Sequence, residues 1–161
     1  MTLVDPKTAV IRHADAEVLG GPPSTGRLLL DSGSTGGALA AVRITLGSGA
    51  DGAVPHQHYT ASEMFFVLDG SVRVLSGEDI LTLGTGDMAV VPPNTDHAFA
   101  AAPGSPADLL IVVTPGFERF GYFRLLEKLK QGEATLDELL ASQDAYDNHF
   151  VDSPAWRRSQ Q

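Results

Sequence analysis

The sequence contains no cysteine, few basic residues and no long apolar run. Without cysteine the protein has no disulfide, no thiolate metal ligand and no cysteine nucleophile, so a metal ion would have to be bound by histidine and carboxylate side chains. The 11 Lys and Arg residues stand against 20 Asp and Glu residues, and the formal net charge of −9 argues against binding to nucleic acid phosphates. No stretch of about 18 apolar residues occurs, and Met1–Pro6 lacks the basic-then-apolar pattern of a signal peptide. We therefore expect a soluble, cytoplasmic protein that binds neither nucleic acid nor membrane.

The distribution of turn residues indicates a single all-β domain up to about Thr114. Turns with glycine and proline recur about every ten residues and separate short segments rich in Val, Ile, Leu and Phe. Residues 42–46 and 71–74 alternate apolar and polar side chains, as strands with one solvent-exposed face do. Asp69–Gly70, with apolar segments on both sides, predicts a tight β-hairpin turn. Many short strands at this spacing predict a closed barrel or a sandwich.

The pattern changes to a helical one after the last predicted strand. Apolar residues recur every three positions over Phe117–Leu129, which predicts an amphipathic helix that packs on the barrel or on a partner subunit. Thr135 and Glu138 have the spacing of a capping box and predict the start of a second helix. Ser153–Pro154 is expected to end any helix before Trp156.

Four residues of the β region form a candidate metal site. His56 and His58 are two positions apart, so both imidazoles point to the same side of a strand. If the predicted hairpin folds back, Glu63 meets them from the adjacent strand, and His97 follows further along the chain. Three imidazoles and one carboxylate suit Fe, Mn, Ni, Co, Cu or Zn rather than Mg or Ca. A lone buried histidine is more often structural, so the interpretation depends on all four residues together.

The same residues resemble the two sequence motifs of the cupin superfamily. His56-Gln57-His58, four residues, Glu63, six residues and Gly70 match the first motif. The resemblance implies a cupin jelly-roll β-barrel and one divalent transition-metal ion bound by the four family ligands, which here are His56, His58, Glu63 and His97.

The second motif is matched with one substitution. Gly86, Pro92 and His97 have the family spacing, and Asn94 stands where glycine is usual. Asparagine is the next-best residue for a left-handed backbone, so we expect the turn to be retained. Two further positions differ from the family pattern, because Ala50 and Ala101 replace a frequent glycine and a frequent asparagine.

A weaker resemblance indicates one group within the cupin superfamily. Residues 114–120 are similar to the segment after the last strand of single-domain, quercetin-dioxygenase-like cupins of actinobacterial type. With the strand pattern, this implies an N-terminal arm with edge strands (1–26), a cupin barrel (27–114) and a helical C-terminal extension (115–161). Cupins of this kind commonly pair through barrel strands, and residues 1–46 offer apolar segments with no other cover, so we expect a homodimer.

Strand parity predicts the residues around the metal. If Glu63 points inward, Phe65 and Val67 do so too, and Phe99 shares the face of His97. An aromatic and aliphatic pocket beside a metal suits a flat, small organic substrate, although these side chains are equally expected as plain barrel core.

Three residues outside this set carry weaker expectations. Tyr59 lies beside the ligand strand and is a candidate substrate contact, with a turn role as the more common alternative. His13 and His149 lie near the two termini and are expected to be ordinary surface residues.

Three functions fit these observations. The leading hypothesis is a mononuclear metal dioxygenase that acts on a hydroxylated aromatic or enol compound, whose acidity the metal increases. The second is non-redox metal catalysis, such as isomerisation or polyketide cyclisation, and the third is a small-molecule-binding cupin without turnover. Because neither motif contains a Cys, a Lys or a fourth His, Glu63 is expected to be the catalytic base, unless it is only a metal ligand.

Overall fold

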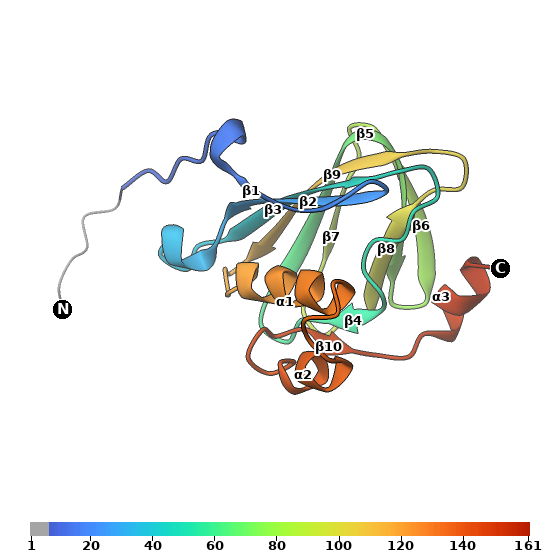
Figure 1. The fold of residues 1–161 in the computed structure, drawn as a ribbon. Helices are drawn as coiled ribbons and strands as arrows, with labels where there is room; N and C mark the ends of the chain where they lie inside the picture. Colours follow the sequence, from blue (N-terminus) through green and yellow to red (C-terminus); the bar gives the residue numbers. More distant parts are fainter. Residues whose placement is uncertain (1–6) are drawn as a thin grey trace.

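Two antiparallel sheets face each other as a jelly-roll β-barrel in a computed structural model that describes residues 7–161 (Figure 1). The strands are β1 (Glu17–Gly21), β2 (Ser24–Leu30), β3 (Ala40–Leu46), β4 (His56–Gln57), β5 (Ser62–Ser76), β6 (Asp79–Gly84), β7 (Met88–Val91), β8 (His97–Ala101), β9 (Ala107–Thr114) and β10 (His149–Phe150). The helices are α1 (Phe120–Lys130), α2 (Leu136–Ala141) and α3 (Pro154–Ser159), with short 3-10 turns η1 (His13–Asp15) and η2 (Ser32–Ser34). The predicted β-barrel with a helical C-terminal extension is confirmed.

Among residues 7–161, no helix is long and apolar enough to cross a membrane. The signal-peptide expectation concerns Met1–Pro6, which lie outside the described residues.

Strand β5 joins the two sheets. Its first half pairs with β9 and β7 and continues through β3, β2 and β1 at the outer edge. Its second half pairs with β6 and β8, and β8 leads to the short strands β4 and β10. One long strand therefore contributes to both walls of the barrel.

The predicted hairpin at Asp69–Gly70 is wrong, because the chain continues through it as one strand. A register shift between Val67 and Asp69 interrupts the pairing with β9, and the burial pattern changes parity across this bulge. Gly70 has a positive φ of 77°, and a Cβ there would collide with the carbonyl oxygen of Pro106. An Asp-Gly pair supplies the left-handed residue that both a hairpin turn and a bulge use, so its sequence does not distinguish the two.

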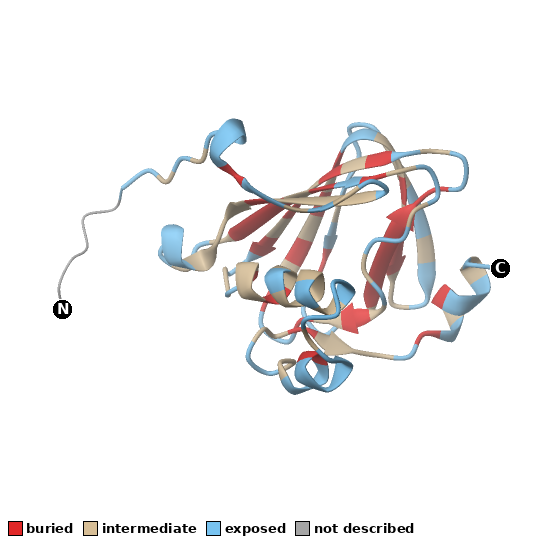
Figure 2. Ribbon diagram, viewed as in Figure 1, coloured by how far each residue is buried: buried red, intermediate tan, exposed pale blue. Residues whose placement is uncertain are grey.

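The core lies between the facing walls, where buried residues alternate along the strands (Figure 2). Phe65, Val67, Val72 and Val74 of β5 are fully buried there. Against the outer side of the second sheet, Trp156 of α3 packs on Leu75, Ala98 and Ala100. The barrel is thus covered on this side by the C-terminal extension.

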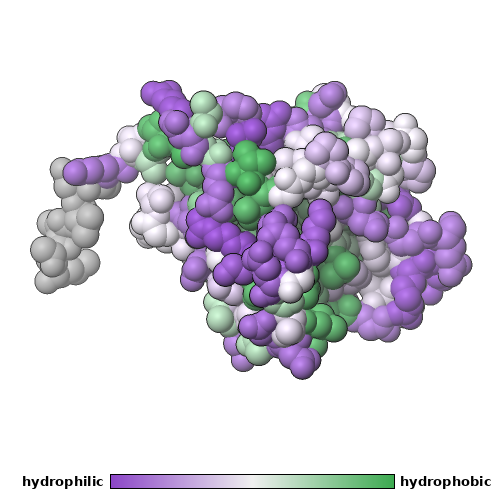
Figure 3. Space-filling view, viewed as in Figure 1, coloured by the Kyte–Doolittle hydropathy of each residue, from purple (hydrophilic) through white to green (hydrophobic). Residues whose placement is uncertain are grey.

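Helix α1 lies across the opening between the sheets (Figure 1). Phe120 and Phe123 pack against the barrel core, which confirms an amphipathic helix in this segment, although it begins after Arg119 rather than at Phe117. The outer side of α1 is hydrophilic, and Figure 3 shows apolar side chains on both sides of it. The backbone N–H groups of Arg119 and Phe120 donate to the Asp31 carboxylate at 2.9 and 3.3 Å, which fixes the start of the helix.

The capping box predicted for α2 is confirmed: Glu138 N donates to Thr135 Oγ1 at 3.2 Å, and Thr135 N donates to Glu138 Oε2 at 2.7 Å. The expectation for Ser153–Pro154 is wrong, because these residues begin helix α3 rather than end one. Proline is favoured in the first turn of a helix, where its missing N–H costs no hydrogen bond.

Candidate metal centre

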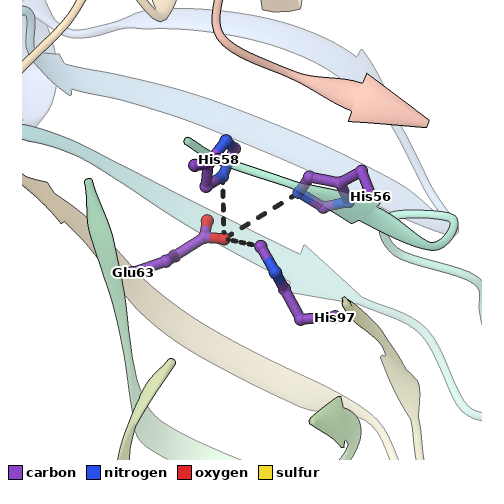
Figure 4. Close-up of side chains that lie close together, drawn as sticks. All are labelled: His56, His58, Glu63 and His97. Atoms are coloured by element: carbon purple, nitrogen blue, oxygen red, sulfur yellow. Dashed lines mark hydrogen bonds and ion pairs between the residues drawn. The ribbon is translucent and has the colours of Figure 1, made fainter. Parts of the chain in front are cut away.

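The four predicted ligands lie together at the centre of the barrel (Figure 4). His56 comes from β4, His58 follows it, and His97 begins β8, where it pairs with His56. Glu63 belongs to the first half of β5 and reaches the histidines from the opposite sheet rather than from a folded-back hairpin. All four side chains are buried, with 1–5% of each residue exposed.

The ligand atoms surround one point. Glu63 Oε2 lies 2.6 Å from His97 Nε2, 3.2 Å from His58 Nε2 and 3.9 Å from His56 Nε2. All four potential donor atoms lie within 4.8 Å of one another. Two ligands about 2.1 Å from one ion are roughly 3 to 4.2 Å apart, so sub-ångström side-chain shifts suffice to place all four around a single ion.

Backbone carbonyl groups fix the histidine rings in the form that a metal requires. Nδ1 of His56 lies 2.7 Å from the Val54 oxygen, and Nδ1 of His97 lies 2.8 Å from the Thr95 oxygen. His58 Nδ1 lies 2.6 Å from the Asp147 oxygen. A carbonyl can only accept, so each Nδ1 carries a proton, and a ring in its neutral form presents the Nε2 lone pair that a metal binds. The hydrogen bonds with Glu63 require a proton on Nε2 instead. This buried His/Glu cluster suits a single metal ion.

The ionisation of the cluster follows from burial and from the close carboxylate. Burial lowers the pKa of His56 well below its usual value, and the nearby His97 acts in the same direction. Burial raises the pKa of Glu63, but hydrogen bonds with His58 and His97 outweigh it and hold this pKa well below its ordinary range. For His97 burial lowers the pKa, yet the hydrogen bond with Glu63 prevails and the pKa is raised. Metal and protons therefore compete for the same lone pairs.

A cavity of about 440 Å³ opens beside the cluster. His56 and Glu63 form part of its wall, together with apolar residues of both sheets and of α1. These apolar residues include Leu28, Ile44, Phe99, Ile111, Phe123 and Leu126. Five polar residues of the C-terminal extension also border the cavity: Arg119, Tyr122, Glu127, Lys130 and Asn148. Burial raises the pKa of Tyr122 to about 12, so its phenol stays protonated at neutral pH.

The residues expected around the substrate occupy different places. Phe99 borders the cavity, whereas Phe65 and Val67 are fully buried in the barrel core. The Phe65 ring packs edge-on against Phe99, with the centroids 5.5 Å apart. Tyr59 is 51% exposed, and its ring stacks on His149 at a centroid distance of 3.6 Å.

His149 is not an ordinary surface residue, which corrects the sequence-based expectation. It lies in β10, which pairs with β4, and its Nε2 is 3.0 Å from Asp147 Oδ1. His13 is exposed, as expected.

Sequence reasoning missed Asp147, which ties the extension to the site. Its carbonyl orients His58, while its carboxylate accepts hydrogen bonds from Tyr59 N at 2.8 Å and Thr60 N at 3.0 Å. It adopts a positive φ of 44°. Its sequence signal is weak, because an aspartate in a left-handed turn is common in any loop.

Comparison with known proteins agrees with this fold. Residues 42–113 match the family described as Cupin domain. KdgF from Halomonas sp. is 22% identical, with a TM-score of 0.57 over 71% of this chain and 97% of that chain. The nucleoside dehydratase Pac13 from Streptomyces is 16% identical, with a TM-score of 0.55 over 70% of this chain and 85% of that chain. Fe(II) HppE is 21% identical, with a TM-score of 0.57 over 69% of this chain and 62% of that chain.

No curated protein matches the sequence at a significant level. The fold and the buried cluster define a jelly-roll barrel with a candidate metal site. Residues 42–113 match the cupin domain family, and the solved structures have the same fold.

Proposed function

We propose that the protein is a metal-dependent enzyme, a mononuclear dioxygenase that acts on a hydroxylated aromatic or enol small molecule. The observation that carries this proposal is the buried three-histidine, one-carboxylate cluster at the wall of a largely apolar cavity of about 440 Å³. A divalent ion bound there supplies Lewis acidity and, if it is redox-active, electrons for reaction with O2. Fe, Mn, Ni, Co, Cu and Zn are the ions that fit the donor set.

The chain's own residues bind, orient and shield the substrate in this proposal. Phe99, Ile111 and Phe123 offer apolar surfaces for a flat ring, and α1 limits access of water from outside. Phe65 and Val67 support this wall from the core. Tyr59, exposed after the ligand strand, is a further proposed substrate contact.

Glu63 is the proposed base. Its Oε2 faces the three imidazoles, while Oε1 makes no hydrogen bond with any other residue of the described chain. A carboxylate with one oxygen at the metal position and one unengaged oxygen can accept the proton of a substrate hydroxyl within about 3 Å. Glu63→Gln keeps an oxygen ligand but removes the basicity, so we expect retained metal and turnover about 100-fold lower. Wild-type turnover in a metal-loaded Glu63→Gln protein would show that another group is the base.

The fold does not by itself choose between redox and non-redox chemistry. Pac13 is described as a nucleoside dehydratase and HppE as an Fe(II) protein, yet both share this fold. The test is elemental analysis of protein purified without added metal, followed by O2 uptake with a panel of flavonols and related phenols. A redox-active ion with O2 uptake that a His97→Ala variant lacks supports the dioxygenase. Zinc with no O2 uptake, but with an isomerised or cyclised product, would contradict it in favour of non-redox catalysis, and tight binding without any product would favour a binding protein.

We also propose that two copies form a homodimer in the cytoplasm. Strand β1 lies at the open edge of the first sheet, and Val10 and Val18 nearby are 62% and 46% exposed. Exposed strand edges need pairing or covering. In this scheme the arm (1–26) pairs, the barrel (27–114) holds the metal and the extension (115–161) closes the cavity. Light scattering that gives 17.0 kDa at every concentration would exclude the dimer.

A further inference from the structure

Arg119 is a buried cation without an ion-pair partner among the described residues. Only 5% of the residue is exposed, yet it takes part in none of the ion pairs found among residues 7–161. Its guanidinium nitrogens approach the side-chain oxygen of Asn148 and the carbonyl oxygen of Tyr146 at 3.4 Å, which are long contacts. An arginine is almost never fully buried unless it is paired with an anion. This side chain has no such anion in direct contact, so we expect a ligand to supply one.

Aromatic rings hold the guanidinium in place without neutralising it. The ring centroids of Phe117, Tyr122 and Phe123 lie 5.1, 4.6 and 5.1 Å from its central carbon. The carboxylates whose charges act on Arg119 are engaged elsewhere: Glu63 in the histidine cluster, Asp31 at the start of α1, and Asp147 at the backbone of residues 59–60. The positive charge is therefore fixed at the wall of the cavity.

A second unpaired donor lies beside it. Asn148 is 1% exposed, and its amide nitrogen has no hydrogen-bond partner among the described residues. The amide is close enough to Tyr122 to lower the pKa of its phenol slightly against the effect of burial, but the two side chains do not form a hydrogen bond. Because Arg119 can only donate, it fixes the Asn148 oxygen toward itself and leaves the NH2 group as a free donor at the cavity wall.

We propose that Arg119 and Asn148 form a carboxylate-binding subsite, so that the substrate is a small organic acid with a carboxylate in addition to its metal-binding hydroxyl. This inference rests on the proposed function, because it places the other end of the substrate at the metal cluster. A planar carboxylate has four lone-pair positions and matches the planar guanidinium and amide donors. One guanidinium balances one carboxylate, whereas a phosphate with almost two charges would need a second buried cation.

The charges of the cavity agree with a doubly anionic substrate. A divalent ion with neutral imidazoles and the Glu63 carboxylate has a net charge of about +1, and Arg119 adds a second positive charge. Glu127 and Lys130 also line the cavity, and their opposite charges cancel. A substrate that carries one carboxylate and one ionised hydroxyl neutralises both. The largely apolar wall between them strengthens each interaction, because little water is available to screen it.

The subsite is tested with two probes that differ only in the carboxylate, 3,4-dihydroxybenzoate and catechol. Calorimetric titration of the metal-loaded protein should give an affinity for the acid about 10- to 100-fold higher than for catechol. Asn148→Asp places a carboxylate of the same size beside Arg119, supplies the missing counter-ion and should abolish this preference. Arg119→Met should do so as well, while catechol binding stays within about twofold of wild type.

The matched control is Arg124→Met, which removes an exposed arginine of the same helix that pairs with Glu17 outside the cavity. It should keep the full preference for the acid. Equal affinity for the two probes in the wild-type protein, including no binding of either at millimolar concentration, would overturn the subsite. So would a preference that persists in folded Asn148→Asp, with folding checked by circular dichroism.

Metal content measured on the same samples separates this inference from the proposed function. A wild-type protein that binds metal but does not prefer the acid retains the metal site and disproves the subsite. A protein that prefers the acid without binding any transition metal supports the subsite and disproves the metal-dependent function.

Discussion

The barrel and the C-terminal extension contribute different halves of the candidate site. The barrel supplies His56, Glu63 and His97 from strands that are joined in two sheets. The extension supplies Arg119 at a helix start and Asn148 beside the two-residue strand β10. In the proposed function the barrel therefore sets the chemistry and the extension selects the substrate, as expected when function is carried by segments placed on a rigid scaffold.

The two halves also differ in how they are held. Strands β5 and β9 pair continuously from Ser62 to Val67, whereas β10 is joined to β4 by two residue pairs. Besides the packing of Phe120, Phe123 and Trp156, the extension is held by individual hydrogen bonds, among them those of Asp31 and Asp147. Segments with few buried contacts open at a lower free energy than core strands. Four variants test this contrast.

The largest effect is expected in the barrel half, from His97→Ala. Loss of one imidazole from a four-ligand site should weaken metal affinity by at least about 100-fold, more than the loss of a supporting hydrogen bond does. Metal content per chain is measured by elemental analysis, with His13→Ala as the exposed-histidine control and circular dichroism as the check on folding. Stoichiometric metal in a His56→Ala/His97→Ala double variant would contradict the site.

Gly70→Ala should be the most destabilising change in the barrel scaffold. The added Cβ collides with the Pro106 carbonyl at the point where β5 passes between the sheets, and we expect a loss of about 3–5 kcal/mol. Gly77→Ala is the matched control, because Gly77 also has a positive φ, of 64°, but has no atom within 4 Å of the added carbon. It should cost only about 1–2 kcal/mol of backbone strain. If the two variants unfold at similar urea concentrations, the loop that contains Pro106 must move to relieve the collision.

The sequence predicted the barrel half of the site better than the extension half, for a physical reason. His56 and His58 share a strand face because of their spacing, and the family motif adds Glu63 and His97. The route of Glu63 was predicted wrongly, since an Asp-Gly pair serves a bulge as well as a turn. Arg119 and Asn148 are 29 residues apart and follow no common periodicity, so only the folded chain brings them together.

Asp147→Gly tests the connection between the two halves. The change keeps the carbonyl that orients His58 and tolerates the positive φ, but it removes the carboxylate that holds Tyr59 and Thr60. We expect metal affinity to fall about tenfold, as for other residues that support a metal ligand. Competition with a chelating dye measures the metal affinity. The control is Asp144→Ala, because the Asp144 side chain is fully exposed. Unchanged affinity would mean that the carbonyl alone suffices.

The smallest effect is expected in the extension half, from Thr135→Ala. The change removes the side chain that accepts from Glu138 N and leaves a helix of only six residues, so α2 should lose about 1 kcal/mol. Because α2 places the buried Leu139 at the cavity wall, its opening should expose that wall without unfolding the barrel. Amide hydrogen exchange should therefore accelerate about fivefold in residues 136–141 and stay unchanged in β5 and β9.

Thr45→Ala on β3, which removes one long contact to Asp108 at 3.4 Å, is the barrel control and should leave α2 unaffected. Equal acceleration in α2 and β5 would mean that the extension and the barrel open together, and the division of the site into a rigid half and a yielding half would then be wrong.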